Sequence, residues 1–139
     1  MIWSARVPAT MALSAAVWAL TLPGHAQQHR KIDVPVVLGG DAGFDACGSS
    51  GIIVGLDPKG DGFLSVQSGP GGKPYREIDR LYNGNPIYIC GEKGKWLAIV
   101  YPADGRDCGV SSPWPKRLPY TGPCRYGWVY SRYVRVTAG

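Results

Sequence analysis

Four cysteines, Cys47, Cys90, Cys108 and Cys124, constrain the fold of this 139-residue chain more than any other feature. An even number of cysteines behind an export signal is typical of disulfides formed in an oxidising compartment. Of the three possible pairings we favour Cys47–Cys90 and Cys108–Cys124. The second pair would close a short proline-rich loop, and the first would tie a leading segment to a central strand. A zinc site is the alternative, but no Cys-x-x-Cys spacing is present, so we expect no metal.

The N-terminus has the pattern of a secretory signal peptide. Arg6 supplies a positive charge, residues 7–22 form an apolar run, and the small residues Gly24 and Ala26 precede Gln27. We therefore predict a signal peptide over residues 1–26 and a location in the periplasm or outside the cell. The apolar run is too short for a membrane span, and we expect none after signal removal.

Twenty glycines and twelve prolines make the chain rich in turns, so helices should be scarce. We predict an all-β fold of one domain. Residues 27–51 would form an N-terminal extension and loop with an extra edge strand, and residues 52–139 a small barrel. Within the barrel, residues 102–126 carry five prolines and two cysteines and would form a disulfide-stapled insertion.

Short apolar segments separated by glycine and proline turns locate the strands. The clearest begins at Gly62, where Leu64 and Val66 alternate with polar residues before the glycine-rich loop at 69–72. Further strands are expected over 52–56, 87–90, 96–101, 127–130 and 134–136, with a hairpin connection at 91–95 and a single turn at 131–133. The expected core comprises Leu64, Val66, Ile78, Leu81, Ile87, Ile89, Ile99 and Val129.

An ordered set of short motifs resembles the bacterial Src homology 3 (SH3) domain. These are Leu64-Ser65-Val66-Gln67-Ser68-Gly69-Pro70, Tyr75, Ile78, Leu81, Asn83-Gly84, Ile87-Tyr88-Ile89, Gly94-Lys95-Trp96, Gly127-Trp128-Val129 and Tyr133-Val134. The resemblance implies a five-stranded, strongly bent SH3-like barrel and a ligand from the cell wall. The chain departs from the family at Ser65, usually Asn, at Gln67, usually Arg, and in its long insertion.

Residues suited to catalysis are few. His25 would leave with the signal peptide and His29 would lie near the new terminus, so no positioned imidazole is expected to activate a nucleophile. Carboxylates such as Asp57 and Asp61 lie in turns, and the glycine loop lacks the lysine that a phosphate-binding loop requires. We expect neither an enzyme nor a cofactor, although a hydrolase remains a third, less favoured interpretation.

The charges are unevenly distributed along the chain. Residues 33–61 hold five acids and one lysine, whereas residues 108–139 hold five basic residues and no acid. Aromatic residues lie between those bases, a combination suited to an acidic polymer, a glycan or an anionic protein face. The alternative is an ordinary solvated surface. Nucleic acid is not an expected partner of an exported protein.

The resemblance and the aromatic residues together predict a non-enzymatic recognition module. Tyr75 and Tyr82 flank the loop that usually carries recognition in this fold class. The expected binding residues are Tyr75, Tyr82, Trp96, Trp114, Lys116, Arg117 and Tyr120. The predicted ligand is a peptidoglycan peptide. The alternative is a protein-interaction module whose insertion docks on an envelope enzyme or a secreted toxin.

Overall fold

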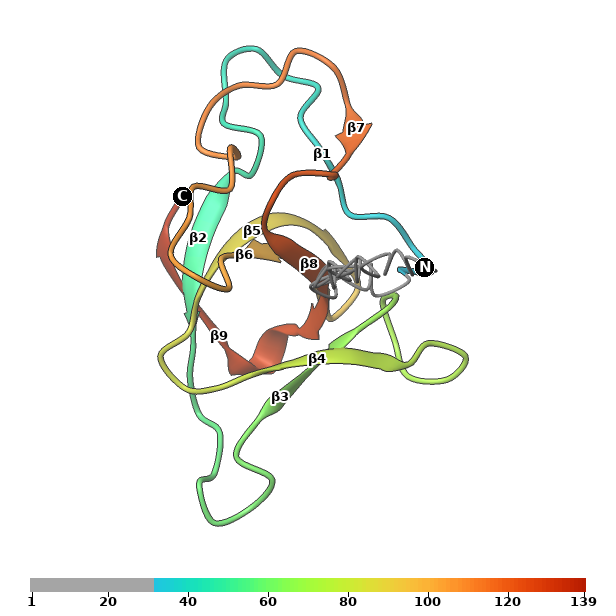
Figure 1. The fold of residues 1–139 in the computed structure, drawn as a ribbon, viewed down its shortest axis with the longest axis vertical. Helices are drawn as coiled ribbons and strands as arrows, with labels where there is room; N and C mark the ends of the chain where they lie inside the picture. The colour runs from blue at the N-terminus through green and yellow to red at the C-terminus, as the bar shows by residue number, and fades with distance from the viewer. Residues whose placement is uncertain (1–31) are drawn as a thin grey trace, which may run out of the picture.

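The computed structural model describes residues 32–139, which are all-β apart from one short 3-10 turn (Figure 1). The predicted signal peptide and residues 27–31 lie outside the described residues. The strands are β1 (Val37–Leu38), β2 (Ser49–Ile53), β3 (Leu64–Gln67), β4 (Glu77–Leu81), β5 (Pro86–Lys93), β6 (Trp96–Tyr101), β7 (Leu118–Pro119), β8 (Arg125–Tyr130) and β9 (Val134–Ala138), and the turn η1 is Ser131–Tyr133.

One sheet contains seven strands in the order β4-β3-β8-β6-β5-β2-β9, and β1 and β7 form a separate pair. All neighbouring strands are antiparallel. The all-β class is confirmed. The five-stranded barrel is not, because the two edge strands, β4 and β9, do not pair with each other and the sheet is open. Strand β2, which was expected over residues 52–56, begins three residues earlier at Ser49 and pairs with both β5 and β9.

The predicted hairpin of β5 and β6 is present, but β5 extends to Lys93, so the connection is residues 94–95 and not 91–95. Lys93 pairs with Trp96, and Gly94 at the connection has a φ of 58°. A positive φ is available to glycine at little steric cost, which suits the tight turns of hairpins. The predicted turn at 131–133 is also present, as η1.

The inner face of the sheet encloses the first core cluster. Six of the eight expected core residues are buried there, and Ile78 and Ile89 are partly buried against them. Alternation along β3 places Leu64 and Val66 in this cluster, as the period-two pattern predicts. The buried members are Ile53, Leu56, Leu64, Val66, Leu81, Ile87, Ile99, Tyr101 and Val129.

A second core cluster, which the sequence patterns do not predict, lies on the other face of the same strands. Ile99 points into the first cluster, whereas Ala98 and Val100 belong to the second. Residues 32–48 and 102–124 cover this second face, and we call them the stapled lobe. The buried members are Val36, Leu38, Ala46, Cys47, Ala98, Val100, Cys108, Val110, Tyr120, Cys124 and Trp128.

Two disulfides hold the stapled lobe, and they join the pairs favoured from the sequence. Cys47–Cys90 links the lobe to β5, and Cys108–Cys124 closes the insertion on itself. Their sequence separations of 43 and 16 residues correspond to about 4 and 3 kcal/mol of stabilisation in the chain-entropy model. The two bridges together use all four cysteines, so no free thiol is left to bind zinc.

Ser68 fastens the start of the lobe to the end of β3. Its buried hydroxyl donates to Asp33 Oδ2 at 2.5 Å and accepts from Arg76 N at 3.1 Å. Arg76 also forms an ion pair with Asp33, and the Ser68 carbonyl accepts from the backbone of Asp33 and Val34. The indole of Trp128 donates to Val34 O at 2.9 Å. These bonds satisfy the buried polar groups where the lobe meets the sheet.

Gly69 is required by the position of Tyr75. A Cβ atom on Gly69 would lie 2.4 Å from Tyr75 Cδ1, and no real contact is this short. Gly72 lies in the same loop and has nothing within 4 Å of its added Cβ.

We predict that Gly69→Ala destabilises the fold by about 1–3 kcal/mol, because the Tyr75 ring must be displaced. The matched variant Gly72→Ala should leave stability within about 0.5 kcal/mol of the parent protein. Denaturant unfolding followed by fluorescence measures both. Equal effects of the two substitutions would contradict the packing of Tyr75 on Gly69.

Candidate functional site

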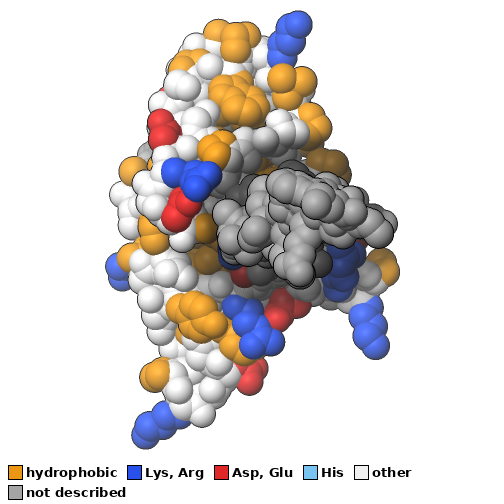
Figure 2. Space-filling view, viewed as in Figure 1, with side chains coloured by type: hydrophobic (Ala, Val, Ile, Leu, Met, Phe, Trp, Pro, Cys, Tyr) orange, Lys and Arg blue, Asp and Glu red, His pale blue; other side chains and the backbone are white. Residues whose placement is uncertain are grey.

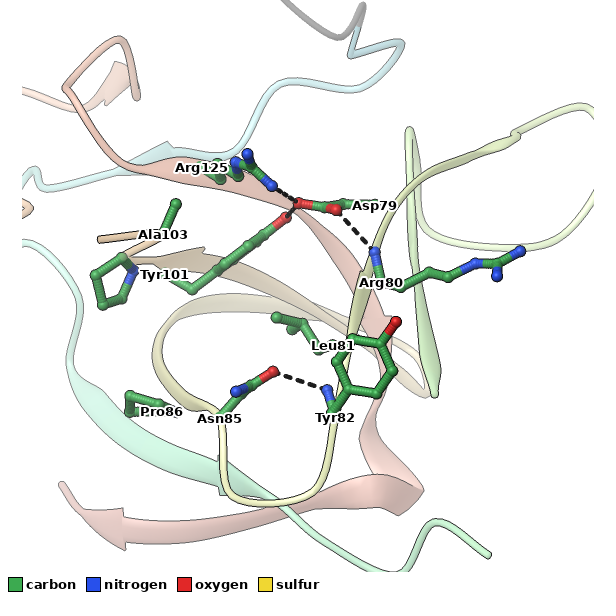
Figure 3. Close-up of a pocket in the computed structure, with 10 residues that line it drawn as sticks. Asp79, Arg80, Leu81, Tyr82, Asn85, Pro86, Tyr101, Ala103 and Arg125 are labelled. Atoms are coloured by element: carbon green, nitrogen blue, oxygen red, sulfur yellow. Dashed lines mark hydrogen bonds and ion pairs between the residues drawn. The ribbon is translucent and has the colours of Figure 1, made fainter. Parts of the chain in front are cut away.

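A pocket of about 240 Å³ lies where the ends of β4 and β6 meet the turn after β4 (Figure 3). Side chains from β4, β6 and β8 reach it. Its lining comprises Asp79, Arg80, Leu81, Tyr82, Asn85, Pro86, Tyr101, Pro102, Ala103 and Arg125.

Asp79 organises the polar wall of this pocket. Its Oδ2 accepts hydrogen bonds from the Tyr101 hydroxyl at 2.9 Å and from Arg125 Nη1 at 2.8 Å. Its Oδ1 accepts from the backbone N–H of Arg80 at 2.9 Å. Figure 3 shows the Tyr101 and Arg125 side chains converging on this carboxylate. Three donors fix its orientation.

The sheet register explains this convergence. Tyr101 and Arg125 are directly opposite on β6 and β8, so their side chains leave from the same face. Asp79 lies opposite Val66 on β3, and its side chain therefore leaves β4 on the inner face. The Asp79 side chain is 13% exposed, whereas that of Arg125 is 51% exposed. A shielded carboxylate thus holds a guanidinium whose other side faces solvent.

The turn from Tyr82 to Asn85 forms the opposite side of the pocket. Asn85 Oδ1 accepts from the backbone N–H of Tyr82 at 2.8 Å, and Asn85 N donates to Tyr82 O at 3.0 Å. Gly84 has a φ of 90°, which the Asn-Gly sequence accommodates. The Tyr82 side chain is left on the surface, since the residue is 53% exposed.

Arg80 lines the pocket but is committed to other partners. Its Nε donates to Glu77 at 2.6 Å, and its guanidinium carbon lies 3.9 Å from the centre of the Phe63 ring. The Ser65 hydroxyl also donates to Glu77, and this bond and the Arg80 bond hold the pKa of Glu77 below its usual value. The bonds to ionised Glu77 therefore stabilise the folded protein. Because the pKa of Glu77 is lower in the folded state, their contribution to the free energy of unfolding is present above the unfolded pKa and is lost as the pH falls through the folded pKa.

The arrangement is suited to binding rather than to proton transfer. Arg125 presents a charged group that prefers planar carboxylates, and Tyr82 presents an exposed ring beside the same cavity. Asp79 already accepts three hydrogen bonds from the protein. The pocket therefore matches a ligand that carries a carboxylate next to an apolar group.

The residues predicted to bind a ligand do not form one surface. Tyr82 lines the pocket, and Tyr75 packs over Gly69. Trp96 lies at the start of β6 beside Tyr130, with 5.7 Å between their ring centres. Trp114 stacks within the stapled lobe, where Lys116 and Arg117 are exposed.

Tyr120 belongs to the core of the lobe and offers no surface to a ligand. It is 2% exposed, its hydroxyl donates to Cys108 O at 2.9 Å, and the same hydroxyl accepts from Cys124 N at 3.2 Å. Burial raises the pKa of Tyr120 above its ordinary value. An aromatic residue between exposed bases was mistaken for a surface residue, because the sequence does not show what covers it.

Asp79, Tyr101 and Arg125 were not identified from the sequence. Asp79 interrupts an apolar strand pattern between Ile78 and Leu81, and this was the available signal. Tyr101 and Arg125 lie on either side of the insertion, and only the pairing of β6 with β8 places them together.

Comparison with protein-family models, with curated proteins and with solved structures gives no match to this chain. Over residues 32–139, no helix has the length and apolar character needed to cross a membrane. In the same part of the chain, no three His, Cys, Asp or Glu side chains are grouped as metal ligands.

We predict that Tyr101→Phe lowers the free energy of unfolding by about 1–2 kcal/mol, because the partly buried Asp79 loses a donor. The control is Tyr88→Phe, since the Tyr88 hydroxyl has no hydrogen-bond partner within residues 32–139. That substitution should change stability by less than about 0.5 kcal/mol. Thermal unfolding at neutral pH measures both, and an unaffected Tyr101→Phe variant would contradict the described network.

Proposed function

We propose that this protein is an exported, non-enzymatic recognition module that binds cell-wall peptides, specifically peptidoglycan stem peptides, at the Asp79–Arg125 pocket. One observation carries the proposal: Asp79 holds the half-exposed guanidinium of Arg125 in a pocket that Tyr82 also lines. Stem peptides carry free carboxylates beside small apolar side chains, which is the chemistry that this pocket matches.

Two further features support the proposal. The ordered motifs resemble the bacterial SH3 domain, and we infer that the open, curved sheet is an elaborated form of that fold. Two disulfides are consistent with an oxidising compartment outside the cytoplasm, where cell-wall material is accessible.

The second candidate function is a protein-interaction module that docks through the stapled lobe. Phe44 and Leu118 are 69% and 48% exposed, although both are large and apolar. Figure 2 shows hydrophobic side chains beside Lys and Arg at the end of the molecule where the two loops of the lobe lie together in Figure 1. Exposed apolar residues that are rimmed by charge are typical of interaction surfaces. An envelope enzyme or a secreted toxin would be the partner.

Purified sacculi test the first proposal by co-sedimentation with the full mature chain. We expect Tyr82→Ala and Arg125→Gln each to weaken binding about tenfold or more, since both remove a group facing the pocket. Phe44→Ala is the matched aromatic control and should bind as the parent protein does. Tyr82 and Phe44 are exposed, so thermal unfolding of their variants should change little. Arg125→Gln also removes a donor to Asp79 and should lower the free energy of unfolding by about 1–2 kcal/mol, so its binding is measured at a temperature where the variant is folded.

Capture of proteins from an envelope extract is measured with the same variants, and the two functions predict opposite results. If Phe44→Ala abolishes capture of an envelope protein while Tyr82→Ala has no effect on sacculus binding, the lobe is the docking surface. Failure of the parent protein to sediment with sacculi would contradict the cell-wall proposal directly.

A further inference from the structure

A row of side chains crosses three strands at the end of the β5–β6 hairpin, away from the pocket. Lys93 on β5 pairs with Trp96 on β6, and Trp96 pairs with Tyr130 on β8. Directly opposite residues of antiparallel strands project from the same face, so these three side chains lie side by side. Tyr133 extends the row, with its ring centre 6.5 Å from that of Tyr130. We call these four residues the aromatic row.

Lys93, Trp96 and Tyr130 lie at the edge of the face that the stapled lobe covers, whereas Tyr133 packs partly against the first core cluster. The next row inward is Gly91, Ala98 and Trp128, of which Ala98 and Trp128 are buried in the second core cluster. Trp96 is only partly buried against that cluster, and Tyr130 is partly exposed. The rings are therefore anchored on one side and accessible on the other.

Three exposed cations belong to the row or adjoin its residues in the chain. Lys93 belongs to the row, Lys95 accepts a backbone hydrogen bond from Ser131 at 2.9 Å, and the Arg132 guanidinium lies 5.9 Å from the Tyr133 ring centre. Within residues 32–139, none of the three has an acidic side chain as partner. The neighbouring acid, Glu92, pairs with Leu97 and so projects from the opposite face. The surface is both aromatic and positively charged.

We propose that the aromatic row binds an acidic glycan, in which pyranose rings carry carboxylates. The flat faces of Trp96 and Tyr130 would stack on sugar rings, and Lys93, Lys95 and Arg132 would bind the carboxylates. Neighbouring strands lie about 4.8 Å apart, which is comparable to the advance per sugar along an extended glycan. The site is distinct from the pocket and does not depend on the proposed function.

An acidic peptide fits the aromatic row less well. Strands β5, β6 and β8 are all interior to the sheet, with paired neighbours on both sides. Peptides that bind sheets usually add to a free edge through backbone hydrogen bonds. The row offers side chains from interior strands, and stacking on rings is the interaction that it provides.

Calorimetric titration of the full mature chain with hexagalacturonate tests the proposal. Maltohexaose supplies the neutral-sugar arm, and hexaglutamate supplies an anion without sugar rings. We expect hexagalacturonate to bind at least about tenfold more tightly than either, with an affinity that falls as salt is added. The absence of binding, or equal binding of hexaglutamate, would overturn the proposal, as would equal binding of maltohexaose.

Variants separate the contributions of stacking and charge. Tyr130→Ala should weaken hexagalacturonate binding about tenfold or more, and Lys93→Gln with Lys95→Gln should weaken it and reduce its salt dependence. The matched charge control, Lys59→Gln, removes an exposed lysine in the turn before β3 and should bind as the parent does. If Tyr130→Ala does not fold, the double variant Lys93→Gln with Lys95→Gln provides the test, because both lysines are exposed. Binding of hexagalacturonate by this double variant as tightly as by the parent protein would overturn the proposal.

Discussion

The packing of β6 on both of its faces is the interaction on which the rest of the structure depends. Ile99 and Tyr101 face the first core cluster, and Ala98 and Val100 face the second. A strand that is buried on both sides has an almost continuous apolar sequence, which residues 96–101 have. Strand β8 shares this position, since Val129 and Trp128 point into different clusters. The curled sheet and the stapled lobe are thus two layers on one scaffold.

Each candidate binding surface lies where this two-sided packing ends. At one end of β6, Tyr101 and the opposing Arg125 meet Asp79 and form the polar wall of the pocket. At the other end, Trp96 and Tyr130 extend beyond the buried rows and remain accessible. The disulfides secure the cover over the rows between them. A rigid centre with functional side chains at its limits is a common way to position recognition residues.

Local patterns in the sequence predicted much of the first layer. The alternation of Leu64 and Val66, the hairpin ending at Trp96 and the disulfide pairing all depend on short segments or on chain order. The second layer was missed, because period-two alternation indicates which residues share a face but not what covers that face. Tyr120 shows the consequence, since its burial depends on a lobe assembled from distant segments. The pocket was missed for the same reason, because Tyr101 and Arg125 meet only through strand register.

Native-state hydrogen exchange tests the two-layer account most directly. The backbone amides of Ala98, Ile99 and Val100 should be among the slowest to exchange, because their strand is interior to the sheet and covered on both faces. The amides of the edge strand β9 should exchange much faster. Exchange of β6 as fast as that of Val136 would contradict the claim that this strand is the common support of both layers.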